Sequence, residues 1–171
     1  MTGQKKSGVN VEYLMGMLAS ADGMIRMQAR KSLVGMGKAS VPALIQALQP
    51  VQPDQVRWEA AKSLGAIGDV RSIPALVRAL EDNDSDVAWL AAEALRRFKK
   101  AAWPPLFRFL ITDGSESARL RQSAYYVLQN QDQKGLNGTF AALLRALNTV
   151  AEPESAPVAA HAMLEMMKTH S

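Results

Sequence analysis

Small and apolar residues recur along residues 54–80 with the spacing of two successive α-helices. In the first helix they follow one another at steps of four, four and three residues: Val56, Ala60, Leu64 and Ile67. This spacing places them on one helix face. Glycines then interrupt the pattern, and Ser72 and Pro74 begin a second apolar helix. Because one such hairpin leaves its apolar faces uncovered, the pattern predicts neighbouring hairpins in the same chain.

The same pattern recurs along the whole chain. The position of Val56, called the reference position below, recurs at intervals of 31, 31, 33 and 38 residues: Ile25, Val56, Val87, Leu120 and Val158. Alanine follows four residues later and leucine or methionine eight residues later: Ala29, Ala60, Ala91, Ala124 and Ala162, then Leu33, Leu64, Leu95, Leu128 and Met166. Packed helices need a small residue at closest approach and a large one beside it. The second helices also align, from P-A-L-I-Q-A-L at Pro42 to A-A-L-L-R-A-L at Ala141.

These units resemble the HEAT-like repeats of the phycobilisome-lyase type. The resemblance rests on V-R-W-E-A-A-K-S-L-G-A-I-G-D and R-S-I-P-A-L-V-R-A-L, and it is closest over residues 54–97. It implies an all-α fold, a right-handed α-α superhelix of about ten helices, with four full repeats and a half repeat at each end. We expect helices near 11–20, 23–35, 41–49, 55–66, 73–81, 86–98, 104–112, 117–130, 139–148 and 157–168. Residues 1–9 are expected to be a disordered tail and residues 10–169 a single repeat domain.

Composition limits the classes of function. The 171 residues are 48% apolar, which is enough for a continuous core, and the net charge of +4 is only mildly basic. No cysteine is present, which excludes disulfides and thiol catalysis. Only two histidines are present, His161 and His170, and metal ligands normally come in clusters, so we expect no metal, no cofactor and no enzymatic activity. The polar first ten residues and the lack of a long apolar stretch predict no membrane span and a cytoplasmic location.

A row of polar residues is predicted on the second helices, four residues after the proline position. It comprises Gln46, Arg78, Arg108 and Arg145. At 100° per residue this position points away from the core. In HEAT stacks the second helices line the concave side, so the row would face a groove and bind the carboxylates or phosphates of a partner. The alternative is that arginine simply occupies a solvated helix face.

A second row is predicted on the outer, convex side of the first helices, two residues after the reference position. It comprises Met27, Trp58 and Trp89, with Tyr126 one turn beyond the equivalent Gln122. Exposed tryptophans would form a contact surface for a protein, since aromatic residues anchor many interfaces. Alternatively, each ring folds back over the loop that precedes its helix. Trp103 is different, because it aligns with core positions of the other repeats.

Arginines also repeat one residue after the reference position, at Arg26, Arg57 and Arg121. They would either bind an acidic partner or bridge to an acid of an adjacent turn, such as Asp54 or Asp69. We expect the structural role, because exposed ion pairs contribute little.

Together these features predict a protein–protein interaction scaffold or adaptor without enzymatic activity. The alternative is weak nucleic-acid binding through a basic concave groove, an architecture similar to that of HEAT-like DNA-repair glycosylases. The resemblance also permits a bilin-lyase-like subunit or a chaperone. All nine methionines lie at the two ends of the chain, so an end of the stack could join two copies into a homo-oligomer.

Overall fold

The computed structural model describes residues 10–112, 117–131, 136–149 and 155–169, and all regular structure in these ranges is helical. The α-helices are α1 (Val11–Leu18), α2 (Gly23–Met36), α3 (Val41–Ala47), α4 (Asp54–Ile67), α5 (Ile73–Arg78), α6 (Ser85–Phe98), α7 (Trp103–Thr112), α8 (Ala118–Leu128), α9 (Asn137–Asn148) and α10 (Ser155–Thr169). Short 3-10 turns accompany them: η1 (Gly37–Ala39), η2 (Val70–Ser72), η3 (Ala79–Glu81) and η4 (Lys99–Ala102). The predicted all-helical solenoid is confirmed. The predicted tail, residues 1–9, lies outside the described residues.

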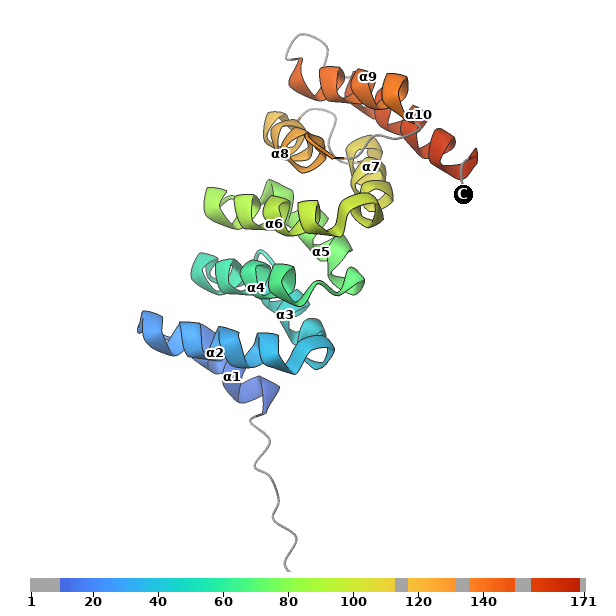
Figure 1. Cartoon of the computed structure of the whole chain (residues 1–171). Coiled ribbons are helices and arrows are strands. Elements are labelled where there is room, and N and C mark those ends of the chain that lie inside the picture. The colour runs from blue at the N-terminus through green and yellow to red at the C-terminus, as the bar shows by residue number, and fades with distance from the viewer. Residues whose placement is uncertain (1–9, 113–116, 132–135, 150–154, 170–171) are drawn as a thin grey trace, which may run out of the picture.

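Helices α2, α4, α6 and α8 stack side by side in one layer, and α1, α3, α5 and α7 form a second layer behind and beside it (Figure 1). The alanines predicted at closest approach, and the leucines four residues later, are fully buried in this first layer: Ala29, Ala60, Ala91 and Ala124, with Leu33, Leu64, Leu95 and Leu128. Between α4 and α6 the approach is so close that a Cβ placed on Gly65 would lie 2.9 Å from the Cβ of Ala94. Small residues therefore set the spacing of the stack.

The C-terminal end departs from the predicted order. Helix α9 packs against α8 and α10, and α7 has its most extensive contact with α10 rather than with α9 (Figure 1). Near their beginnings α7 and α9 still meet, since the rings of Trp103 and Phe140 lie 4.9 Å apart. The second layer thus continues from α7 to α10, so α9 is not a regular second helix beside α7.

The predicted register of the last helix is also wrong. Val158 is 71% exposed and Ala162 is exposed, whereas Ala156, Ala160 and Met163 are buried. The sequence has alanine at both 160 and 162, and each alanine is followed, at helical spacing, by an apolar residue on the same face. Packing against α7 and α9 selects the face with Ala160.

Cross-repeat ion pairs link the first helices to their neighbours. Arg57 of α4 donates from Nε and Nη2 to the two carboxylate oxygens of Asp82, each at 2.8 Å. Glu59 of α4 accepts a hydrogen bond from Arg30 of α2 at 2.6 Å and lies 3.6 Å from Arg26. The structural role expected for Arg26 and Arg57 is confirmed, although their acidic partners are Glu59 and Asp82 rather than Asp54 or Asp69.

Candidate partner-binding face

Adjoining hollows lie along the outer surface of α2, α4, α6 and α8, called the first-helix face below. Among the described residues, the first hollow, of about 480 Å³, lies between α2 and α4 next to the start of α6. The second, of about 740 Å³, lies mainly between α4 and α6, and the third, of about 350 Å³, between α6 and α8. Adjacent hollows share side chains, because Trp58 lines the first two and Trp89 the last two.

The residues predicted on this side of the stack are all placed along these hollows. Met27 lines the first and Tyr126 lines the third. Trp89 is 55% exposed, so the loop before α6 does not cover its ring. Trp58 is half-buried between the first two hollows. Whether these side chains bind a partner remains a prediction.

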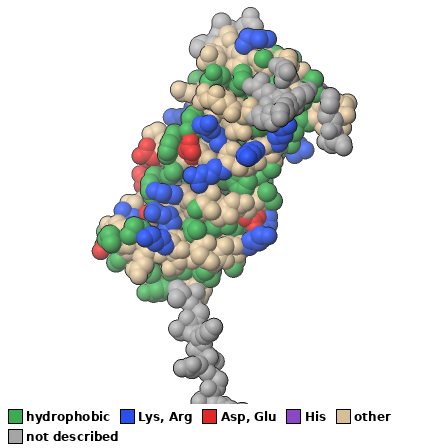
Figure 2. All heavy atoms as spheres, viewed as in Figure 1, with side chains coloured by type: hydrophobic (Ala, Val, Ile, Leu, Met, Phe, Trp, Pro, Cys, Tyr) green, Lys and Arg blue, Asp and Glu red, His purple; other side chains and the backbone are tan. Residues whose placement is uncertain are grey.

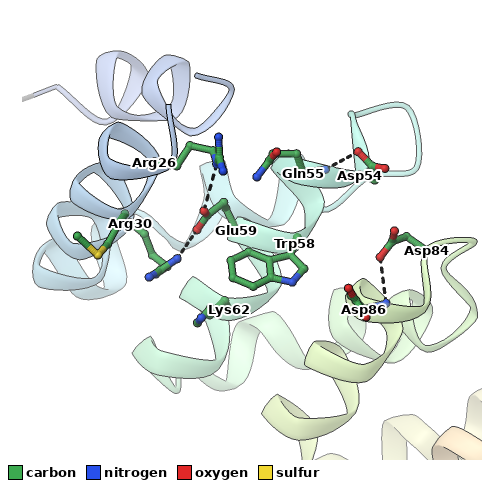
Figure 3. Close-up of a pocket in the computed structure, with 11 residues that line it drawn as sticks. Arg26, Arg30, Asp54, Gln55, Trp58, Glu59, Lys62, Asp84 and Asp86 are labelled. Carbon is green, nitrogen blue, oxygen red and sulfur yellow. Dashed lines mark hydrogen bonds and ion pairs between the residues drawn. The ribbon is translucent and has the colours of Figure 1, made fainter. Parts of the chain in front are cut away.

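Two cations from different helices surround the Trp58 ring (Figure 3). The Nζ of Lys62, one turn further along α4, lies 4.4 Å from the ring centroid. The guanidinium carbon of Arg30, on α2, lies 5.8 Å from it. Both distances fall within the range of cation–π attraction, which favours this arrangement of the ring at the boundary of the two hollows.

The buried carboxylate of Glu59 fixes the arginines beside the first hollow. Arg30 donates to it at 2.6 Å, and Arg26 lies 3.6 Å from it (Figure 3). Arg26 also donates to the backbone oxygens of Ser20 and Ala21, at 2.7 and 2.9 Å. A buried carboxylate is tolerated only when it is paired and hydrogen-bonded. Arg30 therefore has a structural role, and its positive charge is balanced by the carboxylate of Glu59.

The second hollow combines an apolar floor with charged edges. Val34 of α2, Ala61 of α4 and Leu90 of α6 line it together with the Trp89 ring. Its cations include Lys31, Lys62 and Arg97, and none of these has a carboxylate within 4.0 Å in the described ranges. An accessible apolar surface flanked by uncompensated charge is suited to binding rather than to folding.

The acidic residues of the second hollow are Asp86 and Glu93. Glu93 accepts a hydrogen bond from the hydroxyl of Tyr126 and lies 3.9 Å from Arg96. The guanidinium carbon of Arg96 in turn lies 4.7 Å from the centroid of the Tyr126 ring. Tyr126 is thereby held against α6 and closes one side of the third hollow.

Comparison with known families agrees with this repeated geometry. A family model of HEAT repeats matches residues 11–96 and 41–129. The chain belongs to the HEAT-repeat family. The comparison with curated proteins gives no match.

The other predicted row of this HEAT-repeat chain lies on the second helices. Its members Gln46, Arg78, Arg108 and Arg145 are all exposed. Arg78 lines a hollow of about 290 Å³ together with Glu81 and Asp82, which carry the opposite charge. Because α9 is not the principal neighbour of α7, the regular row ends at Arg108 and does not extend to Arg145. A binding role for these residues is untested.

The lysines of the first-helix face were not among the predicted site residues. Lys31 and Lys62 follow Met27 and Trp58 by four residues, which places each pair on one helix face. The signal was therefore present in the repeat alignment. Arg97 and Leu90 carried no comparable repeat signal, because the equivalent positions of other repeats hold different residue types.

The other features considered in the sequence are possible metal ligands, a membrane span and the methionine-rich ends. Within the described ranges no three His, Cys, Asp or Glu side chains lie close enough together to hold a metal ion. His161 is exposed on α10, and His170 lies outside those ranges. No helix that the structure describes is both long and apolar enough to cross a membrane. The two methionine-rich ends differ in exposure: Met24, in the N-terminal part, is 68% exposed, whereas Met163, in the C-terminal part, is buried.

Proposed function

We propose that this HEAT-repeat chain is a non-catalytic protein-interaction module that binds its partner on the first-helix face. The observation that carries the proposal is the 55% exposure of Trp89 at the boundary of two hollows. Aromatic side chains at the edge of apolar hollows supply much of the binding energy in protein interfaces. The module is proposed to act as a single repeat domain over residues 10–169.

The finer family assignment is part of the same proposal. The motif from Val56 to Asp69 supports repeats of the phycobilisome-lyase type. Repeats alone do not carry an activity from one protein to another. The scaffold role is therefore preferred to a lyase subunit or a chaperone because the first-helix face offers an exposed aromatic side chain beside a partly apolar hollow.

A photo-crosslinking experiment in the native host tests the choice of face. A benzophenone amino acid replaces Ala66, which is exposed beside the second hollow, or Gln46, which is exposed on α3. We expect a discrete protein adduct from position 66 and none from position 46. The adduct should disappear when Trp89→Ala is added. Adducts from position 46 alone would transfer the binding role to the second-helix row.

A further inference from the structure

We propose that the second hollow binds an acidic, extended peptide segment that carries an apolar anchor residue. This inference rests on the proposed function, because it names the chemistry of the partner at the same face. It follows from the apolar floor of the hollow, from its excess of positive charge and from the repeat spacing of two lysines.

The apolar part of the hollow is large enough for an anchor side chain. The whole second hollow has a volume of about 740 Å³, within the roughly 300–1,000 Å³ of sites that enclose small ligands. Val34, Ala61 and Leu90 supply a floor from three different helices. The exposed ring of Trp89 supplies a wall on which an aliphatic or aromatic side chain can pack.

The charge at the edges selects an acidic segment. Lys31, Lys62 and Arg97 lack a carboxylate partner in the described structure, whereas Arg30 is already paired with Glu59. Figure 2 shows Lys and Arg side chains gathered over the visible first-helix face. A partner carboxylate beside these cations would gain attraction without breaking an existing ion pair.

Acidic side chains lie towards the opposite end of the face. Asp54, Asp84 and Asp86 line the first hollow, near the beginnings of α4 and α6. The cations Lys31, Lys62 and Arg97 belong to the C-terminal halves of their helices. Among the charges of these two hollows that have no ion pair in the described ranges, acids and cations are thus separated along the helix axes, and a peptide should place its acidic residues over the C-terminal halves.

The repeat sets the spacing of the acidic groups. Lys31 and Lys62 occupy equivalent positions on α2 and α4, two helices that pack side by side. Packed helix axes are about 8–10 Å apart. An extended peptide in the polyproline II conformation rises about 3.1 Å per residue and returns to the same side every three residues, so carboxylates about three residues apart would meet both lysines.

Nucleic acid fits this hollow less well. The ring of Trp58 already has Lys62 and Arg30 against it, which leaves less of it free to stack on a base. Asp86 and Glu93 also line the second hollow, where they would repel a continuous line of phosphates. Separate carboxylates on a peptide can avoid them.

Selection from a displayed library of random peptides tests the inference on the full chain. Each round uses the native protein for binding and Trp89→Ala for counter-selection. We expect the peptides retained to be enriched in Asp and Glu, with spacings of about three residues, beside a large apolar residue. Their affinity should fall with added salt, because the pairs lie at the surface.

Matched charge reversals complete the test by fluorescence anisotropy with the selected peptides. The pair Lys31→Glu and Lys62→Glu should weaken binding about three- to tenfold. The control pair Arg78→Glu and Arg108→Glu changes the net charge equally on the other face and should leave binding unchanged. Equal losses from both pairs would overturn the inference, since binding would then follow only the overall charge.

The outcomes separate this inference from the proposed function. Peptides that need Trp89 but show no acidic enrichment would overturn the acidic partner and leave the binding face standing. A library that yields no peptide sensitive to Trp89→Ala would overturn the face itself. A single-stranded oligonucleotide that binds more tightly than the peptides, and loses binding in Trp89→Ala, would replace the peptide by nucleic acid.

Discussion

Arg57 and Asp82 form a bidentate ion pair, with both N–O distances at 2.8 Å, between α4 and the turn that leads into α6. Arg57 is buried, and Asp82 also accepts a hydrogen bond from the backbone N–H of Asp84, the N-cap of α6. The hydrogen bond to Asp82 raises the pKa of Arg57, so the guanidinium remains charged at any ordinary pH. The pair thus connects one repeat to the start of the next.

Asp82→Ala should destabilise the fold by about 2–3 kcal/mol, because it leaves a buried charged donor without its main acceptor. The midpoint of urea unfolding measures the loss. Lys168→Ala removes the ion pair with Glu165, in which both side chains are exposed, and should shift the midpoint much less. Equal shifts in the two variants would show that the Arg57 pair has no special structural role.

Gly65→Ala should weaken the contact between α4 and α6. The new Cβ would lie 2.9 Å from that of Ala94, so the two helices must move apart, at a cost of about 1–3 kcal/mol. Gly35→Ala in α2 meets open space and should stabilise by up to about 1 kcal/mol through helix propensity. Thermal unfolding of both variants checks the opposite signs. A stabilising Gly65→Ala would mean that the stack is looser than described.

The three tryptophans should report three environments. Trp103 is buried against Phe107 and Phe140, so Trp103→Ala should cost about 3–5 kcal/mol and remove a blue-shifted, quencher-protected emission. Trp89→Ala should change stability little, because the ring is mainly exposed and leaves no cavity. Acrylamide quenching of single-tryptophan variants measures the accessibility. A protected Trp89 in the isolated chain would contradict its proposed role.

The two alanines of α10 distinguish the observed register from the one predicted by the repeat. Ala160 is buried and Ala162 is exposed. Ala160→Leu should therefore overpack the contact with neighbouring helices and cost about 1–3 kcal/mol, whereas Ala162→Leu should be nearly neutral. Chemical denaturation decides between them, and the reverse ranking would restore the predicted register.

Asp69 should make stability depend on pH in the acidic range. Hydrogen bonds from the guanidinium of Arg71, and then from its backbone N–H, lower the pKa of Asp69 from 3.8 to about 2. Because the folded-state pKa is the lower one, this stabilisation is fully present above about pH 3.8 and is lost as the pH falls through about 2.

Asp69→Asn should retain the backbone hydrogen bond and lose the charge. We expect the wild-type chain to be the more stable of the two near neutral pH, with a difference that shrinks as the pH falls towards about 2. Urea unfolding across this range gives the comparison. A difference that stays constant with pH would assign the effect to something other than ionisation of Asp69.

The sequence by itself determined the repeat and the side of α2, α4, α6 and α8 that faces the core. Alanine and leucine at fixed steps predicted the buried positions of α2, α4, α6 and α8, because helical periodicity is a local property. The same periodicity predicted that Trp89 and Arg78 point outward and that Trp103 is buried, as the structure has them. These outcomes depend on rotation about a single helix axis and need no knowledge of the partner helix.

Only the tertiary structure decided which side chains meet across helices. It paired Arg57 with Asp82, placed Arg30 beside Trp58, and brought Lys31 and Arg97 to one hollow. It also placed α10 beside α7, where local pattern favoured α9. Such contacts depend on the spacing and rotation of helices relative to one another. In α10, the sequence alone could not decide whether the face with Ala160 or the face with Ala162 is buried, because both fit a helical pattern. Packing against α7 and α9 chose between them.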